Sequence, residues 1–316
     1  MEYIPYYFGN SPSSQKYFES NNKCFDQIIP TWLQLKEDGS LLTHISDSDS
    51  KLFSKYNFFP YTSPLIQNYQ LSSKVTNSFL GSEKNIDNGI KNMVNFLKNN
   101  SFDEINIDLE GVNKNNKENF LKFIEKLADK MGVLNYRLGI SIPAKTENHV
   151  DTGWAGAYDY ERLGRLVDKV IIMAYDYHWP GGPAGPIAPL SWVYDVIDYV
   201  IMQISNKKIY IGVPFYGYDW IINKENKKAK GLSYHQIMKL KEKYDGTIEW
   251  DQESETPYYC YESEDEKHEV WFENINSILK KLDLMNKFQI KGAAFWRLGL
   301  EPPELWEELS KRRSCY

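Results

Sequence analysis

The most informative segment of this chain reads Phe102-Asp103-Glu104-Ile105-Asn106-Ile107-Asp108-Leu109-Glu110. Three aliphatic residues alternate with one amide and two carboxylates, and this period of two predicts a strand with an apolar face and a polar face. Two carboxylates on one face repel each other and lose hydration on burial. Such a pair is useful where one acid must stay protonated beside an ionised neighbour, as in the cleavage of a glycosidic bond.

Seven other short β-like runs are predicted to be strands: Tyr3–Phe8, Gln27–Leu33, Pro64–Tyr69, Arg137–Ile142, Lys169–Tyr175, Lys208–Phe215 and Ile290–Trp296. Between them, apolar residues recur at helical spacing, notably from Ile86 to Leu97, from Phe120 to Met131 before Gly132, and from Trp192 to Ile204. Eight strands that alternate with helices predict the α/β class and a (β/α)8 TIM barrel. An open doubly wound sheet is disfavoured, because no glycine-rich phosphate turn follows the first strand.

The domain organisation follows from the same alternation of strands and helices. We expect a single barrel to span residues 1–316, a length that can bury a sizeable core. The charged region 222–272 breaks the alternation. It therefore predicts a small α+β subdomain inserted between the seventh strand and the seventh helix.

Composition limits the classes of partner. A formal charge of −6 without a basic block argues against nucleic acid, and the absence of a run of about 18 apolar residues argues against a membrane span. The three cysteines, Cys24, Cys260 and Cys315, show no spacing typical of a disulfide framework or a metal site. Residues 1–5 are interpreted as strand rather than signal peptide, so we expect synthesis in the cytoplasm. Aromatic residues make up 15% of the chain and suit the faces of sugars.

Barrel enzymes carry their chemistry at the carboxyl ends of the strands. Asp108 and Glu110 end the fourth predicted strand, and Asn106 continues its polar face into the barrel. Two residues along a strand span about 6.6 Å. This spacing does not choose between the carboxylate separations of retaining and inverting hydrolases.

The other strand ends supply further candidates. The sixth strand ends in Met173-Ala174-Tyr175-Asp176, which places Tyr175 and Asp176 at the same mouth. His178, among aromatic residues, is interpreted as a hydrogen-bonded residue of the cleft wall. The loop 180–186, rich in proline and glycine, continues that wall. Tyr216 and Trp296 end the seventh and eighth strands; Trp296 could floor a sugar subsite or belong to the top layer of barrel packing.

These motifs resemble glycoside hydrolase family 18. The fourth-strand signature D-x-x-D-x-D-x-E reads from Asp103 to Glu110 with Asn106 in place of the second acid, M-x-Y-D is intact at 173–176, and the eighth-strand tryptophan is Trp296. Within the family, the segments 106–110, 175–190 and 295–299 are similar to the peptidoglycan-directed branch that lyses spore cortex fragments. The resemblance covers nearly the whole chain.

The resemblance implies a retaining, substrate-assisted hydrolase of β-N-acetylglucosaminyl linkages in peptidoglycan or cortex fragments, with no cofactor and no metal. Glu110 would act as general acid and base, and Asp108 would orient the acetamido N–H. Tyr175 would donate to the acetamido carbonyl with support from Asp176. The implied substrate-binding residues are Trp296, Asn106, Tyr6, Met173, Tyr216 and His178.

Several alternatives stay open at this point. A chitinase or an endo-β-N-acetylglucosaminidase would use the same site with a different cleft. A non-catalytic sugar-binding protein on the same barrel is disfavoured, because such relatives typically lose the acid and Glu110 is present. Exo or endo cleavage and the oligomeric state are not decided by the sequence. If the spore-branch resemblance holds, deposition from the mother cell onto the forming spore is the route we expect to the cell wall.

Overall fold

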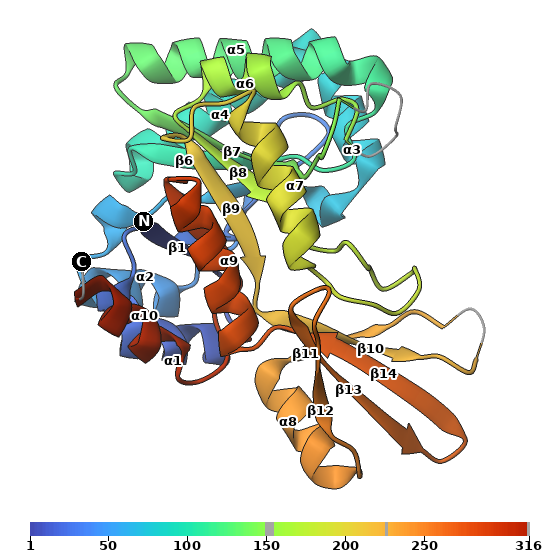
Figure 1. Ribbon diagram of the computed structural model, residues 1–316. Coiled ribbons are helices and arrows are strands. Elements are labelled where there is room, and N and C mark those ends of the chain that lie inside the picture. The colour runs from blue at the N-terminus through green and yellow to red at the C-terminus, as the bar shows by residue number, and fades with distance from the viewer. Residues whose placement is uncertain (149–154, 225–226, 315–316) are drawn as a thin grey trace.

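The large sheet of the protein is a ring of parallel strands. A computed structural model describes residues 1–148, 155–224 and 227–314 (Figure 1). The ring contains β1 (Glu2–Tyr7), β2 (Ile29–Pro30), β3 (Leu33–Leu35), β5 (Leu65–Asn68), β6 (Glu104–Asp108), β7 (Arg137–Pro143), β8 (Lys169–Met173), β9 (Ile209–Pro214) and β15 (Gly292–Trp296). Together with the covering helices it forms the predicted α/β TIM barrel.

The second strand position of the barrel consists of two pieces. β2 pairs with β1, β3 pairs with β5, and an isolated bridge joins Ile28 to Thr62. The prediction of one continuous strand over Gln27–Leu33 was therefore wrong in detail. Pro30 carries no amide hydrogen to extend the ladder, and the Trp32 amide turns back to the Pro30 carbonyl at 2.9 Å. β4 (Leu41–Thr43) runs antiparallel to β3 outside the ring.

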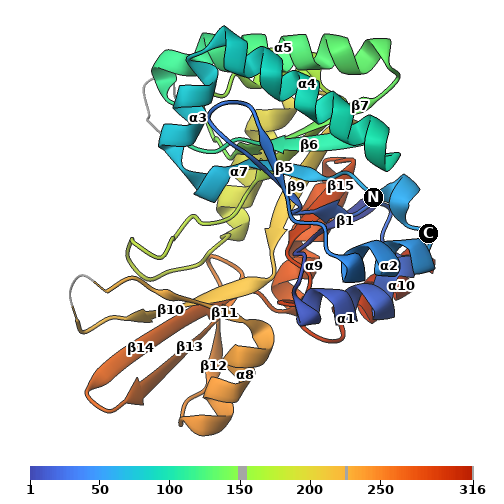
Figure 2. The same cartoon turned by 180° about the vertical axis from the view of Figure 1, so that it is seen from behind.

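The helices form the outer layer around the barrel (Figures 1 and 2). They are α1 (Pro12–Asn21), α2 (Asp47–Lys55), α3 (Ser73–Leu80), α4 (Glu83–Asn100), α5 (Lys117–Val133), α6 (Tyr160–Leu166), α7 (Leu190–Ile201), α9 (Ile275–Lys287) and α10 (Leu305–Ser314). Short 3-10 turns are η1 (Asn22–Cys24), η2 (Phe59–Tyr61), η3 (Tyr69–Leu71) and η4 (Lys114–Asn116). The predicted apolar stripes face the core, although α7 ends before Ile204, which is buried in the turn that follows.

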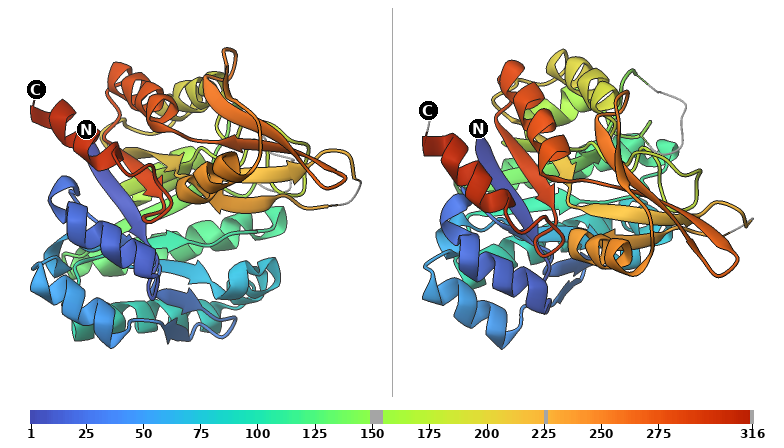
Figure 3. Two further views of the ribbon diagram at one scale, coloured as in Figure 1. Left: turned by 90° about the horizontal axis from the view of Figure 1, so that it is seen from below. Right: turned by 60° about the horizontal axis from the view of Figure 1, so that its bottom comes forward.

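A second, antiparallel sheet stands beyond the carboxyl end of β9. It contains β10 (Tyr216–Ile221), β11 (Lys230–Ser233), β12 (Ile248–Asp251), β13 (Thr256–Ser263) and β14 (Glu266–Phe272), in the order β11-β10-β14-β13-β12. α8 (Tyr234–Lys243) packs on one face through Ile237, beside the buried Val270 and Phe272. Figure 3 shows this unit projecting to one side of the barrel. This unit runs from Tyr216 to Phe272, whereas the insertion was predicted over residues 222–272; residues 225–226 lie outside the described residues.

Two further sequence expectations concern thiols and membranes. Cys24 and Cys260 are free thiols, and Cys315 lies outside the described residues. None of the helices in the described ranges has the length and apolar character needed to cross a bilayer.

Candidate active site

The end of β6 carries the two acids that the sequence singled out. Asp108 is the last residue of the strand and is 3% exposed, and Glu110 lies two residues further on. The backbone of Glu110 is held from both sides: its N–H donates to Asn68 Oδ1 at 3.0 Å, and its carbonyl accepts from Thr76 Oγ1 at 2.8 Å. Gly111 then turns the chain with a φ of +66°, in a place where a Cβ would lie 2.7 Å from the Cβ of Ser73. The position of Glu110 is thus fixed by its backbone.

Glu110 stands where two hollows meet. The first hollow, of about 520 Å³, is lined by Asp108, Glu110, Met173, Tyr175, Asp176, Tyr216 and Trp296, among others. The second, of about 560 Å³, shares Glu110, Met173, Tyr175 and Asp176 with the first and adds Pro143, Trp179 and Pro180. The four predicted catalytic residues therefore lie at one place, at the carboxyl ends of β6 and β8.

Burial controls the protonation of the two acids. It raises the pKa of Asp108 well above its ordinary value, and the charge of Glu110 adds to this effect. A hydrogen bond of 3.0 Å from Gln67 Nε2 to Asp108 Oδ2 opposes it. Burial likewise raises the pKa of Glu110, with a contribution from the charge of Asp176. The site therefore favours a protonated Glu110 at a higher pH than a solvated glutamate would allow.

Asp176 follows β8 in a left-handed conformation, with a φ of 60°, which aspartate tolerates better than most residues. Its Oδ1 accepts hydrogen bonds from the hydroxyls of Tyr216 at 2.5 Å and Tyr218 at 2.9 Å, both on β10. Burial raises the pKa of Asp176, and the two hydroxyls oppose that rise. The small sheet therefore provides part of the site.

The Tyr175 ring depends on a glycine of the neighbouring strand. Gly212 lies on β9, and a Cβ there would come within 2.7 Å of Tyr175 Cε1 and 2.9 Å of the Ile172 carbonyl oxygen. The missing side chain makes room for the tyrosine inside the barrel.

Tyr6 and Asn106 form a buried layer below the first hollow rather than its surface. Both contact the Ser141 hydroxyl, Tyr6 through its own hydroxyl at 2.8 Å and Asn106 through Nδ2 at 2.7 Å. The Tyr6 ring meets the Trp296 ring edge to face, with centroids 4.9 Å apart. Tyr6 therefore packs against Trp296, and the Ser141 hydroxyl links Tyr6 to Asn106.

His178 lies outside the set of residues that line the two hollows. Its Nδ1 is 2.9 Å from the Pro186 carbonyl oxygen. Its ring packs against Gly185, where an added Cβ would lie 2.6 Å from His178 Cε1. It thereby anchors the loop that follows β8.

Sequence reasoning did not place several lining residues in the site, among them Gln67, Trp179, Tyr218 and Arg297. Gln67 gave a signal, as a polar residue within the apolar third strand. Tyr218 alternates with Tyr216, and Arg297 follows Trp296 directly. Trp179 is 55% exposed, and its indole packs against Gly181, where there is no side chain in the way.

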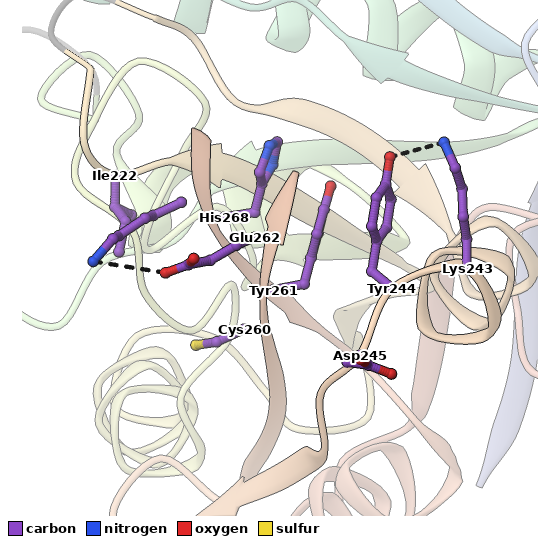
Figure 4. Close-up of a pocket in the computed structure, with 9 residues that line it drawn as sticks. Ile222, Lys243, Tyr244, Asp245, Cys260, Tyr261, Glu262 and His268 are labelled. Atoms are coloured by element: carbon purple, nitrogen blue, oxygen red, sulfur yellow. Dashed lines mark hydrogen bonds and ion pairs between the residues drawn. The ribbon is translucent and has the colours of Figure 1, made fainter. Parts of the chain in front are cut away.

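A third hollow lies in the small sheet, apart from the acids (Figure 4). The rings of Tyr244, Tyr261 and His268 lie side by side there, with Tyr261 stacked on both neighbours. The buried Asp219 accepts from the Tyr261 hydroxyl and contacts His268 Nδ1, both at 2.8 Å. None of the predicted site residues lines this hollow. Across the residues that the structure describes, no group of three or more His, Cys, Asp or Glu side chains is arranged to hold a metal.

A parallel barrel that delivers three carboxyl groups and a buried tyrosine to one hollow at its carboxyl end has the architecture of a glycosidase barrel. The family model described as glycosyl hydrolases family 18 matches residues 6–301. The chain belongs to this family, and the prediction made from its motifs is confirmed.

Known relatives support the predicted branch. The cortical fragment-lytic enzyme of Bacillus subtilis is 30% identical over 212 residues, which are 66% of this chain and 49% of the relative. That of Bacillus anthracis is 30% identical over 247 residues, 77% of this chain and 57% of the relative. The chain thus spans about half the length of these curated relatives.

Solved structures agree. The spore cortex-lytic enzyme SleL of Bacillus megaterium has a TM-score of 0.88 at 26% identity, covering 98% of this chain and 73% of that one. A chitinase from Chromobacterium violaceum has a TM-score of 0.89 at 22% identity, covering 98% of both chains, a likeness that concerns the fold alone.

Proposed function

We propose that the protein hydrolyses β-N-acetylglucosaminyl linkages in peptidoglycan or spore cortex fragments, with retention of configuration and with assistance from the substrate's own acetamido group. The observation that carries this proposal is the meeting of Asp108, Glu110, Tyr175 and Asp176 in one hollow. The substrate class is suggested by the cortical fragment-lytic enzymes that the chain resembles.

In the first step, Glu110 protonates the departing glycosidic oxygen. The acetamido oxygen attacks the anomeric carbon while the bond from this carbon to the glycosidic oxygen breaks. This gives a cyclic oxazolinium ion and releases the leaving sugar. The raised pKa of Glu110 suits this role, because a general acid must hold its proton at the working pH.

Asp108 and Tyr175 act on the acetamido group. Gln67 occupies one oxygen of Asp108, and Oδ1 is buried without a hydrogen-bond partner among the described residues, so it can accept from the acetamido N–H. The positive charge that develops on the oxazolinium ion favours the ionised form of Asp108. Tyr175, supported by Asp176, donates to the acetamido oxygen and directs it.

In the second step, ionised Glu110 takes a proton from water. The water oxygen adds to the anomeric carbon on the face that the leaving sugar vacated, and the bond from this carbon to the acetamido oxygen breaks, which regenerates the acetamido group. Two displacements at one carbon restore the original configuration.

The mechanism is tested with paired substrates, one carrying the 2-acetamido group and one carrying a 2-hydroxyl in its place. We expect products, followed by mass spectrometry, only from the acetamido substrate. Efficient cleavage of the hydroxyl analogue would rule out assistance by the substrate. The linkage is tested with purified cortex fragments and chitin oligomers in parallel.

A further inference from the structure

Arg297 differs in charge from everything around it in the cleft. Among the described residues that line the two hollows it is the one cationic side chain, and Asp108, Glu110 and Asp176 are the acids. It follows Trp296 directly in the chain and lines the same hollow as that indole. Each of these acids repels a negative group on a ligand when it is ionised, so Arg297 is the residue of this lining that can attract one.

The guanidinium of Arg297 is held in place but has no acidic partner of its own. Its Cζ lies 4.4 Å from the centre of the Phe8 ring, a cation–π contact that orients the planar group. Among the residues that the structure describes, its buried Nη1 has no hydrogen-bond partner and no carboxylate forms an ion pair with Arg297. A buried donor left unpaired is costly, and a ligand that accepts from it would remove that cost.

Glu301 is the acid that acts electrostatically on Arg297, and its oxygens are already used. Oε2 accepts from the Gly299 N–H at 2.5 Å, and Oε1 accepts from Trp306 Nε1 at 2.8 Å. Burial raises the pKa of Glu301 to about 7, so much of its charge is absent near neutral pH. Burial lowers the pKa of Arg297, but a guanidinium stays charged at physiological pH. The positive charge of Arg297, a residue that lines the hollow, is thus incompletely neutralised by the protein.

We propose that Arg297 binds a carboxylate carried by the glycan, and that it thereby selects acidic N-acetylated glycans over neutral ones such as chitin. Arginine presents two parallel N–H donors that match the two oxygens of a carboxylate. In peptidoglycan this carboxylate has two sources, the lactyl ether of a muramic acid residue and the peptide attached to it. The proposal rests on the proposed function for its substrate class, but it concerns binding and can be tested without turnover.

The test measures affinity by titration calorimetry with the Glu110→Gln protein, which keeps the cleft and lacks the general acid. Three probes isolate the carboxylate: a tetrasaccharide of alternating N-acetylglucosamine and N-acetylmuramic acid with free lactyl carboxylates, its neutral methyl ester, and the form whose lactyl groups carry a peptide with a free carboxylate. We expect the free acid, the peptide form or both to bind about 10- to 100-fold more tightly than the ester. The form that does so identifies the source.

Adding Arg297→Gln should bring the ratio of acid to ester affinity to about one, and Arg297→Lys should restore part of it. The matched control, Arg162→Gln, removes an exposed arginine that pairs with Glu118 outside the site, and should leave the ratio unchanged. Because the readout is a ratio within one protein, a general loss of affinity does not imitate the effect. The proposal is overturned if the ester binds as well as both acidic forms, or if Arg297→Gln leaves the ratio intact. Failure of the proposed function would instead appear as absent turnover in the wild-type protein, whatever the binding ratio.

Discussion

The hydroxyl of Tyr216 donates a hydrogen bond of 2.5 Å to Asp176, and so joins the small sheet to the acids of the barrel. Tyr216 is the first residue of β10 and lies two positions after Pro214, the last residue of β9. Tyr218 on the same strand donates a second hydrogen bond to the same oxygen. The small sheet is therefore part of the chemistry of the site. Burial raises the pKa of Asp176 and the hydrogen bonds from the two tyrosines of this sheet oppose that rise, while the charge of Asp176 in turn raises the pKa of Glu110.

Removing the charge of Asp176 should change the pH at which Glu110 loses its proton. Since that charge helps to raise the pKa of Glu110, Asp176→Asn should lower it, and the alkaline limb of the profile of kcat/KM should move to lower pH. The measurement is kcat/KM for a chromogenic N-acetylglucosaminide between pH 4 and 9. Asp103→Asn, which changes an exposed acid paired with Arg137, should leave the limb in place. A shift to higher pH would contradict the assignment.

Glu110→Gln should abolish hydrolysis and preserve sugar binding. Glutamine has nearly the same shape but cannot give up a proton to the leaving oxygen, so we expect kcat to fall by about 10²–10⁴-fold. Turnover of cortex fragments and calorimetric affinity for N-acetylglucosamine oligomers measure the two effects separately. Glu118→Gln, at an exposed glutamate paired with Arg162, is the matched control and should retain full activity. Unchanged turnover in Glu110→Gln would remove Glu110 from the mechanism.

Gly212→Ala should damage the site from within the barrel. The new methyl group would lie 2.7 Å from the Tyr175 ring and 2.9 Å from a backbone oxygen, so the ring must move or the strand must shift. We expect kcat to fall more than about 10-fold and the protein to lose about 1–3 kcal/mol of stability.

The same glycine-to-alanine change at Gly132 provides the control for Gly212. This residue lies in α5 with nothing within 4 Å of a Cβ, and the change should stabilise the protein by about 0.5–1 kcal/mol without altering kcat. Thermal unfolding and steady-state kinetics decide both cases. Full activity in Gly212→Ala would show that Tyr175 need not keep its position.

Glu301 should make stability depend on pH near neutrality. Its pKa is raised from 4.5 to about 7, so its contribution to the free energy of unfolding is full below pH 4.5 and is lost as the pH rises through 7. The loss approaches about 3 kcal/mol well above pH 7. Glu301→Gln should flatten that part of the curve of unfolding free energy against pH, as measured with urea between pH 4 and 9. Glu307→Gln, at an exposed acid of α10 paired with Lys311, should reproduce the wild-type slope.

The sequence was most informative where residues close in the chain are also close in space. The alternation from Ile105 to Glu110 predicted both the strand and its acids, and the motif from Met173 to Asp176 predicted the neighbouring strand end. Gln67 and Tyr218 could not be placed in this way. Each reaches an acid from another strand, 41 and 42 positions away in the chain from its partner, and only the folded structure brings them together.

Two elements were predicted less accurately, and each error has a local cause. The apolar periodicity predicted that the third helical stripe extends to Ile204, whereas α7 ends at Ile201. Ile204 is buried from the turn that follows, and periodicity does not distinguish the two cases. The break between β2 and β3 depends on the missing amide hydrogen of Pro30, whose effect on strand pairing becomes clear only once the neighbouring strands are known.

That break gives the ring a seam. Two residue pairs join β2 to β1, whereas β6, which carries Asp108, has three residue pairs with β5 and four with β7, and β8 has five with β7 and three with β9. In hydrogen–deuterium exchange, amides along β2 and β3 should therefore take up deuterium first, and partial opening on heating should begin there. The acids follow or end β6 and β8, which are paired with neighbouring strands along both edges. The catalytic geometry should therefore persist when β2 and β3 begin to open.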